Sequence, residues 1–269
     1  MKKRIDTKLL IPIISLAVAA LIVILGATVF LVRDIDVSFG EGSDIVSKED
    51  IVAASGLKRN QNILFIKEKN AAAAIQSAYP YLKVTNIERR FPHDVIIFVA
   101  KRNPIIKIEL DDGNFALLDR EMFVVEKVSK ERLANLELLY GGFSGVSYKI
   151  SADEVKEGAV LSPKAEEPYI AFTQNIVAAF EMAGIFERAF CQFVDDVKFD
   201  YLSGLWSIEI KTKSGVSFKF DSDNLIDKAL KAYGWYDAEF TREESSQNLT
   251  KGYILYVKQY DDFIYIGGD

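Results

Sequence analysis

The longest apolar run in the sequence lies close to the N-terminus, where no charged residue occurs between Leu9 and Val32. A helix rises about 1.5 Å per residue, so a run of this length can cross a hydrocarbon layer of about 30 Å. The run is longer than the core of a cleaved signal peptide, and it ends without a small-x-small site. Four basic residues precede it, which places the N-terminus in the cytoplasm by the positive-inside rule. We therefore predict a cytoplasmic tail over 1–8, a transmembrane helix over 9–32 and an extracytoplasmic remainder.

The segment that follows alternates between the two-residue period of strands and the longer period of helices. Ser47 stands before two acids and an apolar pair, as at a helix start, and Gly56 is placed to end that helix. Pro80 has to end a second, alanine-rich helix, because proline disfavours the α conformation of its predecessor. The predicted elements are a strand over 35–39, helices over 47–56 and 67–78, and strands over 84–91 and 95–100. This order predicts a β-α-α-β-β domain over 33–104.

Beyond residue 105 the pattern is mostly that of strands with one buried face, separated by turns such as Asp-Gly and Ser-Gly. The predicted elements are strands over 106–110, 115–118, 123–125, 197–201, 206–210, 216–220, 253–260 and 263–266, with helices over 169–183 and 223–230. We predict a β domain of mainly antiparallel strands with flanking helices over 105–240. The last segment, 241–269, either completes this domain or binds partners. The predicted fold class is α+β, with a single N-terminal transmembrane helix.

The strand predicted near the C-terminus is unusually apolar and aromatic. Its candidate contact residues are Tyr253, Leu255, Tyr256, Val257 and Tyr260. One interpretation is a core strand that is buried on both faces. The other is an edge strand whose backbone pairs with an incoming segment of a partner protein. The residues alone leave both interpretations open.

Composition narrows the chemistry that the chain can perform. With one cysteine, Cys191, and one histidine, His93, the chain can form no intramolecular disulfide, and His/Cys zinc sites and Cys-His nucleophilic sites are nearly excluded. Cys191 stands at a predicted strand start and is interpreted as a small buried residue. Residues 34–269 hold 28 basic and 38 acidic residues, a formal charge of −10. An acidic surface repels phosphate backbones, so nucleic acid is not an expected partner.

Short strings that imitate catalytic motifs carry little weight. Ser55-Gly-Leu-Lys58, Lys213-Ser-Gly215 and Ser222-Asp-Asn224 are similar to elements of a penicillin-recognising serine enzyme, but the last two occur in the wrong order. Paired acids at 111–112, 195–196 and 261–262 could act as catalytic acids or cation ligands. Two of the three pairs lie in probable turns, so solvated turns are the preferred interpretation. We therefore predict no catalytic, cofactor-binding or metal-binding residues.

A series of short motifs is similar to one known family. The motifs are Ser47 to Ile51, Gly56-Leu57, Asn62 to Leu64, Tyr79 to Tyr81, Arg89 to Pro92, Lys101 to Pro104 and the apolar strand after Asp119. They resemble the FtsQ/DivIB family of bacterial cell-division proteins, whose first extracytoplasmic unit is a POTRA domain. The resemblance implies a POTRA domain over 33–104. Its signature residues are Ser47, Asp50, Gly56, Pro80, Arg90, Phe91, Pro92, Arg102 and Pro104.

The resemblance also implies a function without catalysis. It leads us to expect a bitopic, single-pass type II protein of the bacterial cell membrane that acts as a divisome scaffold at the septum. The expected partners are FtsL-like and FtsB/DivIC-like single-span coiled-coil proteins, together with septal peptidoglycan synthases. The family recruits partners through the C-terminal part of its β domain, which favours strand addition near Tyr253.

Three departures from the family pattern concern the later motifs. Lys101 replaces a usual glutamate, Arg120-Glu121 replaces a turn glycine, and the strand over 253–257 lacks an aspartate. Two alternative functions compete with the scaffold. A membrane-anchored penicillin-recognising enzyme predicts a covalent adduct at Ser55. A POTRA-bearing transport or assembly factor requires a cleavable signal, which the N-terminal run does not resemble.

Overall fold

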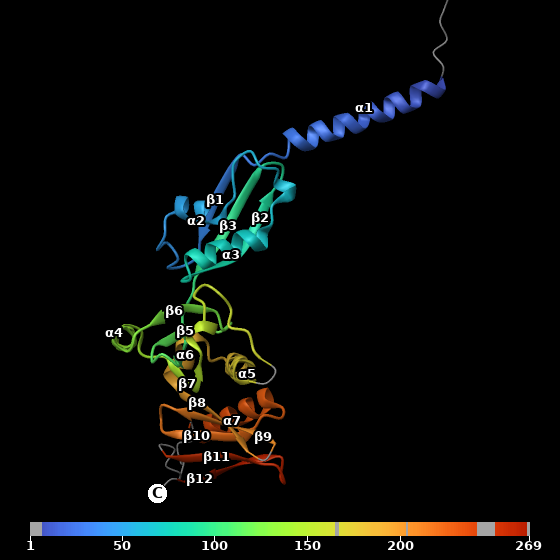
Figure 1. Cartoon of the computed structure of the whole chain (residues 1–269). Coiled ribbons are helices and arrows are strands. Elements are labelled where there is room, and N and C mark those ends of the chain that lie inside the picture. The colour runs from blue at the N-terminus through green and yellow to red at the C-terminus, as the bar shows by residue number, and fades with distance from the viewer. Residues whose placement is uncertain (1–6, 165–166, 203, 241–250, 268–269) are drawn as a thin grey trace, which may run out of the picture. The chain divides into compact units, whose positions relative to one another are not determined.

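The computed structural model describes residues 7–164, 167–202, 204–240 and 251–267. The chain divides into two compact units, Met1–Lys101 and Arg102–Asp269 (Figure 1). Each unit has its own cluster of buried apolar side chains. The cytoplasmic tail expected over 1–8 falls mostly outside the described residues.

The N-terminal apolar run forms one helix, α1 (Thr7–Thr28), whose described apolar segment is Ile11–Leu21. Within the described residues, no single helix is both long and apolar enough to cross a membrane. One bent pair of helices, α5 (Tyr169–Met182) and α6 (Glu187–Phe193), could do so together by length and composition. α1 ends before the predicted boundary at Val32, because Val32 is fully buried in the core of the next domain. The apolar character of a run does not by itself show which of its residues face lipid and which face a protein core.

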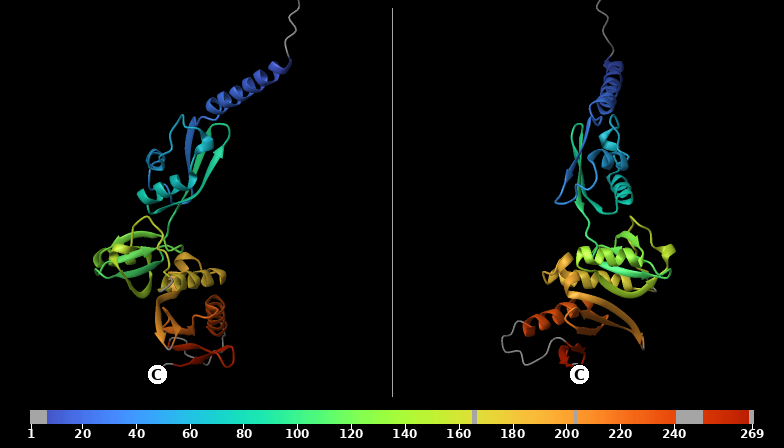
Figure 2. Two further views of the ribbon diagram at one scale, coloured as in Figure 1. Left: turned by 45° about the vertical axis from the view of Figure 1, so that its right-hand side comes forward. Right: turned by 90° about the vertical axis from the view of Figure 1, so that its left-hand side faces the viewer.

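The first unit contains a three-stranded sheet with two helices on one face (Figure 2). Its elements are β1 (Asp34–Phe39), α2 (Lys48–Ser55), the short 3-10 turn η1 (Ile63–Phe65), α3 (Glu68–Ala78), β2 (Leu82–Arg90) and β3 (Asp94–Lys101). β3 lies in the centre, parallel to β1 and antiparallel to β2. Ile51, Ile75 and Ile97 are completely buried in the core of this unit. The β-α-α-β-β order predicted from the sequence is confirmed.

Local sequence signals set the ends of the two helices. The Ser47 hydroxyl accepts a hydrogen bond from the Asp50 N–H (3.2 Å) and donates one to the Asp50 carboxylate (2.7 Å). Gly56 ends α2 with a φ of 68°, a conformation that glycine adopts without strain. α3 ends at Ala78, directly before the residue that Pro80 restricts.

Replacing Ser47 by alanine is expected to lower the free energy of unfolding of the first unit by about 1 kcal/mol, because the N-cap acceptor is lost. Hydrogen exchange of the α2 amides in the full chain measures this change. Both tryptophans, Trp206 and Trp235, lie in the second unit, so tryptophan fluorescence is expected to stay unchanged. Ser47→Asp keeps an N-cap oxygen and is the matched control. Equal amide protection in all three chains would contradict the role assigned to Ser47.

The second unit is built on one mixed sheet of nine strands in the described part of the chain (Figure 1). The strands are β4 (Ile106–Leu110), β5 (Phe115–Leu118), β6 (Val124–Val128), β7 (Ser144–Ile150), β8 (Val194–Leu202), β9 (Leu205–Thr212), β10 (Val216–Asp221), β11 (Gly252–Val257) and β12 (Asp262–Ile266). Their order across the sheet is β12-β11-β10-β9-β8-β7-β4-β5-β6. The pairs β4–β7, β7–β8 and β10–β11 are parallel, and the other five described pairs are antiparallel.

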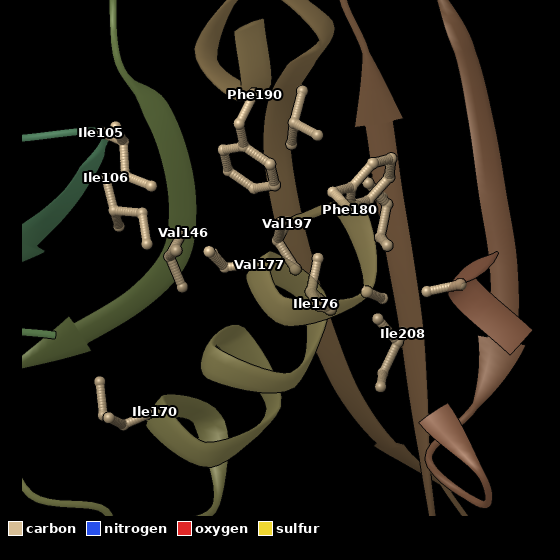
Figure 3. Close-up of a cluster of buried hydrophobic side chains, with 14 of the residues drawn as sticks. Ile105, Ile106, Val146, Ile170, Ile176, Val177, Phe180, Phe190, Val197 and Ile208 are labelled. Carbon is tan, nitrogen blue, oxygen red and sulfur yellow. The ribbon is translucent and has the colours of Figure 1, made fainter. Parts of the chain in front are cut away.

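Helices α5 and α7 (Leu225–Phe240) pack against one another and form the main core of this unit with the sheet and α6. Figure 3 shows the side chains of α5, among them Ile176, Val177 and Phe180, meeting those of the neighbouring strands. The opposite face of the sheet carries charged side chains, such as the pair Lys149–Glu109 (2.9 Å). One-sided burial of this kind explains the alternation of apolar and polar residues in strands such as β4 and β9. At β5 and β6 the opposite face is covered as well, because Leu117 and Val128 pack with Leu133 of the helix Lys130–Tyr140 in a separate buried cluster.

Three helices, α4 (Lys130–Tyr140), α6 and α7, differ from the sequence-based expectations. α4 has no counterpart among the predicted elements, although Ser129 caps its start and Gly141 ends it. α7 extends to Phe240, past the predicted end at Leu230, because Ala232 and Tyr236 continue its buried face.

Cys191 also lies elsewhere than predicted. It belongs to α6 rather than to the start of a strand. Its side chain is fully buried, as expected, and the thiol donates to the Ile105 carbonyl oxygen (3.1 Å). Burial raises the pKa of the thiol, which keeps it protonated and unreactive.

Candidate partner-binding surface

The terminal hairpin of β11 and β12 forms one end of the nine-stranded sheet. β11 is parallel to β10 and antiparallel to β12, with Tyr253 opposite Ile266 and Leu255 opposite Ile264. Among the strands that the structure describes, β12 has β11 as its one neighbour. The strand predicted near Tyr253 is therefore second from the edge, and the edge strand itself is β12.

The backbone of β12 has one side that points away from β11. The Phe263 N–H donates to the Asp262 carboxylate (2.8 Å), so this donor does not take part in the ladder with β11. Backbone groups along an antiparallel strand alternate in direction, so the N–H of Tyr265 points the same way as that of Phe263, and Gly267 directly follows the end of β12 at Ile266. An edge of this kind is the surface to which another extended segment can add.

The hairpin also presents apolar side chains on the sheet face opposite the core. Tyr253, Ile264 and Ile266 are 40%, 44% and 44% exposed, and Leu255 is half-buried. These residues lie together because residues opposite one another in a ladder share a face. The Lys219 ammonium lies 3.5 Å from the centroid of the Tyr253 ring and helps to fix it. We call Tyr253, Leu255, Ile264 and Ile266 the hairpin face.

The other side of the hairpin attaches it to the core. Phe263 is buried, and its ring centroid lies 5.5 Å from that of Tyr256. The Tyr256 hydroxyl donates to the Asp261 carboxylate (2.8 Å), a bond that raises the pKa of the phenol. Lys228 of α7 lies 4.2 Å from the centroid of the Tyr256 ring and forms an ion pair with Asp221 at the end of β10. These contacts hold the hairpin against α7 and β10.

The candidate contact residues fall into three groups in the structure. Tyr253, Leu255 and Val257 alternate along β11 and share the face away from the core. Tyr256 points toward the core side, and Tyr260, 69% exposed, lies in the turn after β11. The structure therefore brings three of the five candidates together on one surface.

Ile264 and Ile266 were absent from the sequence-based candidates. They alternate with Phe263 and Tyr265 directly after the acidic turn, a pattern typical of a strand with unlike faces. That alternation could have identified the two isoleucines as a surface pair. The position of β12 at the edge depends on the order of the whole sheet, which no local pattern contains.

The POTRA signature residues of the first unit have structural partners. Those at 47, 50, 56 and 80 set the helix ends described above. Arg90 forms a surface ion pair with Glu88 (3.1 Å). Phe91 and Pro92 are joined by a cis peptide bond in the exposed turn between β2 and β3.

Arg102 is the first residue of the second unit and is only 4% exposed. Its guanidinium forms an ion pair with the buried Asp119 and lies 3.7 Å from the centroid of the Phe123 ring. The Asp119 carboxylate also accepts the N–H groups of Glu121 (2.8 Å) and Phe123 (3.0 Å). The motif aspartate thus organises a turn that contains no glycine.

The carbonyl oxygen of Pro104 is held by a guanidinium, that of Arg188. It accepts a hydrogen bond from Arg188 of α6 (2.9 Å). The same guanidinium donates to the carbonyl oxygens of Tyr140 and Gly142, the latter at 2.7 Å. Arg188 therefore ties the start of β4 to the end of α4.

The serine that an acylating enzyme would require is engaged in helix capping. Ser55 is 5% exposed, and its hydroxyl donates to the Val52 carbonyl oxygen (2.6 Å) and accepts the Leu57 N–H (3.1 Å). It belongs to the first unit, whereas Lys213 and Ser222 belong to the second. Among the described residues, no group of three or more His, Cys, Asp or Glu side chains is arranged to hold a metal ion.

Comparison with protein-family models defines the class of the first unit. Residues 30–102 match a POTRA domain, in agreement with the β-α-α-β-β order of the structure. The matching model is of the FtsQ type, which confirms the resemblance of these motifs to the FtsQ/DivIB family. The match ends at Arg102, where the second unit begins. No curated protein matches the chain.

Proposed function

We propose that this chain is a non-enzymatic scaffold of bacterial cell division that binds and positions other membrane-anchored division proteins at the septum. The FtsQ-type POTRA domain supports a role in division. The observation that supports binding is the terminal hairpin, where an edge strand adjoins an exposed apolar face. An extended partner segment gains main-chain hydrogen bonds from the edge and apolar contacts from the hairpin face.

In this proposal α1 anchors the chain in the membrane as a single-pass type II helix. The uncharged run over 9–32 and the basic residues before it support this role. The FtsQ-type domain directly after the helix supports it further. The N-terminus then lies in the cytoplasm, and both units lie outside at the septum.

The proposed partners are FtsL-like and FtsB/DivIC-like single-span coiled-coil proteins, with septal peptidoglycan synthases as a further class. A segment that adds to β12 places alternate side chains on the two faces of the sheet. Those that meet the hairpin face have to be apolar, since Ile264 and Ile266 are exposed there. The partner segment is therefore expected to be short, extended and apolar at every second residue.

Replacing Ile264 and Ile266 together by lysine is expected to abolish capture of these partners by the full chain. Both side chains are substantially exposed, so the fold tolerates the change, while two charges oppose desolvation of the hairpin face. Co-purification of the full chain with candidate division proteins measures capture. The matched control replaces Leu138 and Leu139 of α4, which are 86% and 73% exposed, by lysine. Equal capture by the two double variants would exclude the hairpin face as the binding surface.

A pair of substitutions at Gly267 tests strand addition separately from side-chain contact. A Cβ at Gly267 meets the Tyr265 ring at 3.8 Å, an ordinary contact distance, so alanine is tolerated. Gly267 follows the last residue of the ladder with β11, so proline there leaves the described pairs intact while it removes an N–H that the alternation of β12, continued by one residue, directs toward an added strand. Gly267→Pro is expected to weaken partner capture while Gly267→Ala does not, and equal capture would contradict strand addition at this end. A proline at Leu255 is unsuitable, because β11 is paired on both sides.

A further inference from the structure

Three large apolar side chains are exposed at one end of the POTRA domain. Phe65 is 79% exposed, Phe91 is 57% exposed and Leu64 is 45% exposed. A single exposed apolar side chain is ordinary on a protein surface, whereas a group of them marks a contact surface. We call Leu64, Phe65 and Phe91 the Phe65 patch.

The Phe65 patch surrounds the point where the chain passes from α1 into the domain. The Ile63 N–H donates to the Phe30 carbonyl oxygen (2.8 Å). The Phe91 ring packs edge-to-face on the Phe30 ring, with 6.1 Å between centroids. α1 ends at Thr28, and the two residues from there to Phe30 span at most about 7 Å. The chain therefore keeps the patch close to the end of α1 in any orientation of the domain.

The fold holds these side chains outward. Ile63 and Ile66 are buried on either side of Leu64 and Phe65, which fixes the direction of η1. The Arg89 guanidinium donates to the Leu64 carbonyl oxygen (3.3 Å), so the end of β2 is tied to the same turn. The exposure of Leu64 and Phe65 is thus a property of the folded domain.

Basic residues accompany the Phe65 patch. Residues 58–69 hold four basic side chains and one acid, and residues 89–94 hold two basic side chains and one acid. Lys58, Lys67 and Lys69 are exposed. Arg59, Arg89 and Arg90 form ion pairs with Asp34, Glu68 and Glu88, so the exposed lysines supply the positive charge beside the patch. A surface that complements the Phe65 patch and its lysines has negative charge in its outer layer and an apolar layer below it.

We propose that the Phe65 patch inserts into the headgroup layer of an anionic lipid bilayer and holds the POTRA domain against the membrane. The inference rests on the proposed role of α1 as the anchor. Aromatic and aliphatic side chains enter the boundary of the acyl chains, while lysine and arginine attract anionic headgroups. The anchor supplies a high effective concentration of bilayer, so three apolar side chains suffice for a contact that would be too weak for a free domain.

Site-specific fluorescence on the full chain in lipid nanodiscs tests this contact. Cys191 is fully buried, so a cysteine introduced at Phe65 can be labelled selectively with an environment-sensitive fluorophore. The nanodiscs contain phosphatidylcholine alone or with phosphatidylglycerol. We expect a blue shift and several-fold stronger quenching by nitroxide-labelled lipid at residue 65 than at the control, and a larger effect with phosphatidylglycerol. The control is Ile45→Cys, an exposed apolar residue (56%) that follows the opposite end of β1.

The outcomes separate this inference from the proposed function. A chain that does not co-elute with nanodiscs overturns the anchor, and the lipid contact with it. A chain that is incorporated, with quenching at residue 65 no greater than at residue 45, overturns the lipid contact alone. A blue shift at residue 65 that requires an added division protein assigns the Phe65 patch to a protein partner and also overturns the lipid contact.

Discussion

Arg102→Met is expected to lower the free energy of unfolding of the second unit by about 3–5 kcal/mol, because it leaves a buried carboxylate without its cation. Arg102 and Asp119 are each 4% exposed, so water cannot replace the lost partner. The guanidinium also covers the Phe123 ring, and that contact is lost as well. Urea denaturation followed by tryptophan fluorescence measures the change, since Trp206 and Trp235 both lie in this unit.

A second substitution separates the charge from the packing. Asp119→Asn keeps a side-chain oxygen for the N–H groups of Glu121 and Phe123 but removes the negative charge. The double variant of Arg102→Met with Asp119→Asn is expected to be more stable than Arg102→Met alone, because no uncompensated charge remains. If the double variant is no more stable, the loss arises from packing on Phe123 and the ion-pair account is wrong.

Phe180→Ala is expected to cost the second unit about 3–5 kcal/mol, because it leaves a cavity where three helices meet. Phe180 is 1% exposed, and its ring centroid lies 5.6 Å from those of Phe190 and Phe193 and 5.8 Å from that of Tyr233 (Figure 3 shows Phe180 and Phe190). The ring therefore joins α5, α6 and α7. The same urea denaturation experiment measures its loss.

Two controls bracket this prediction. Phe180→Leu keeps part of the buried volume and is expected to be less destabilising than alanine. Leu138→Ala removes a side chain that is 86% exposed and is expected to change stability by no more than about 0.5 kcal/mol. Similar midpoints for Phe180→Ala and Leu138→Ala would show that the junction of the helices does not depend on Phe180.

Much of the first unit could be predicted because its sequence signals act over short distances. Ser47 caps α2 by accepting a hydrogen bond from an N–H only three residues further along the chain. Gly56 ends the same helix by its own backbone conformation. Pro80 acts on its immediate neighbour. The N-terminal helix ends at Thr28 rather than at the predicted Val32. Its end could not be predicted from hydropathy, since the same apolar side chain suits a bilayer and a protein core.

The second unit was less predictable because its order depends on distant segments. β7 begins at Ser144, inside a glycine-rich stretch that reads as a loop, and it pairs in parallel with β4 and β8. The parallel pair of β10 and β11 brings Val216 opposite Gly252 across the whole of α7. The apolar and aromatic composition of the strand at Tyr253 was the one signal that indicated a contact surface there. The edge strand and its Ile264 and Ile266 emerge only when the sheet is assembled.

The carboxylate on the outward N–H of Phe263 has a consequence for selectivity between edges. A strand that docks there must first displace the hydrated Asp262 carboxylate from this N–H. An extended chain of unrelated sequence therefore gains less binding free energy here than on an edge whose N–H groups are not occupied by a side chain. A second copy of this protein brings its own Asp262 and Asp261 to the same place, and like charges repel. The edge is therefore expected to resist chain-to-chain polymerisation even when the protein is crowded in one region of an envelope. A partner that supplies a cation opposite Asp262 removes this barrier for itself alone.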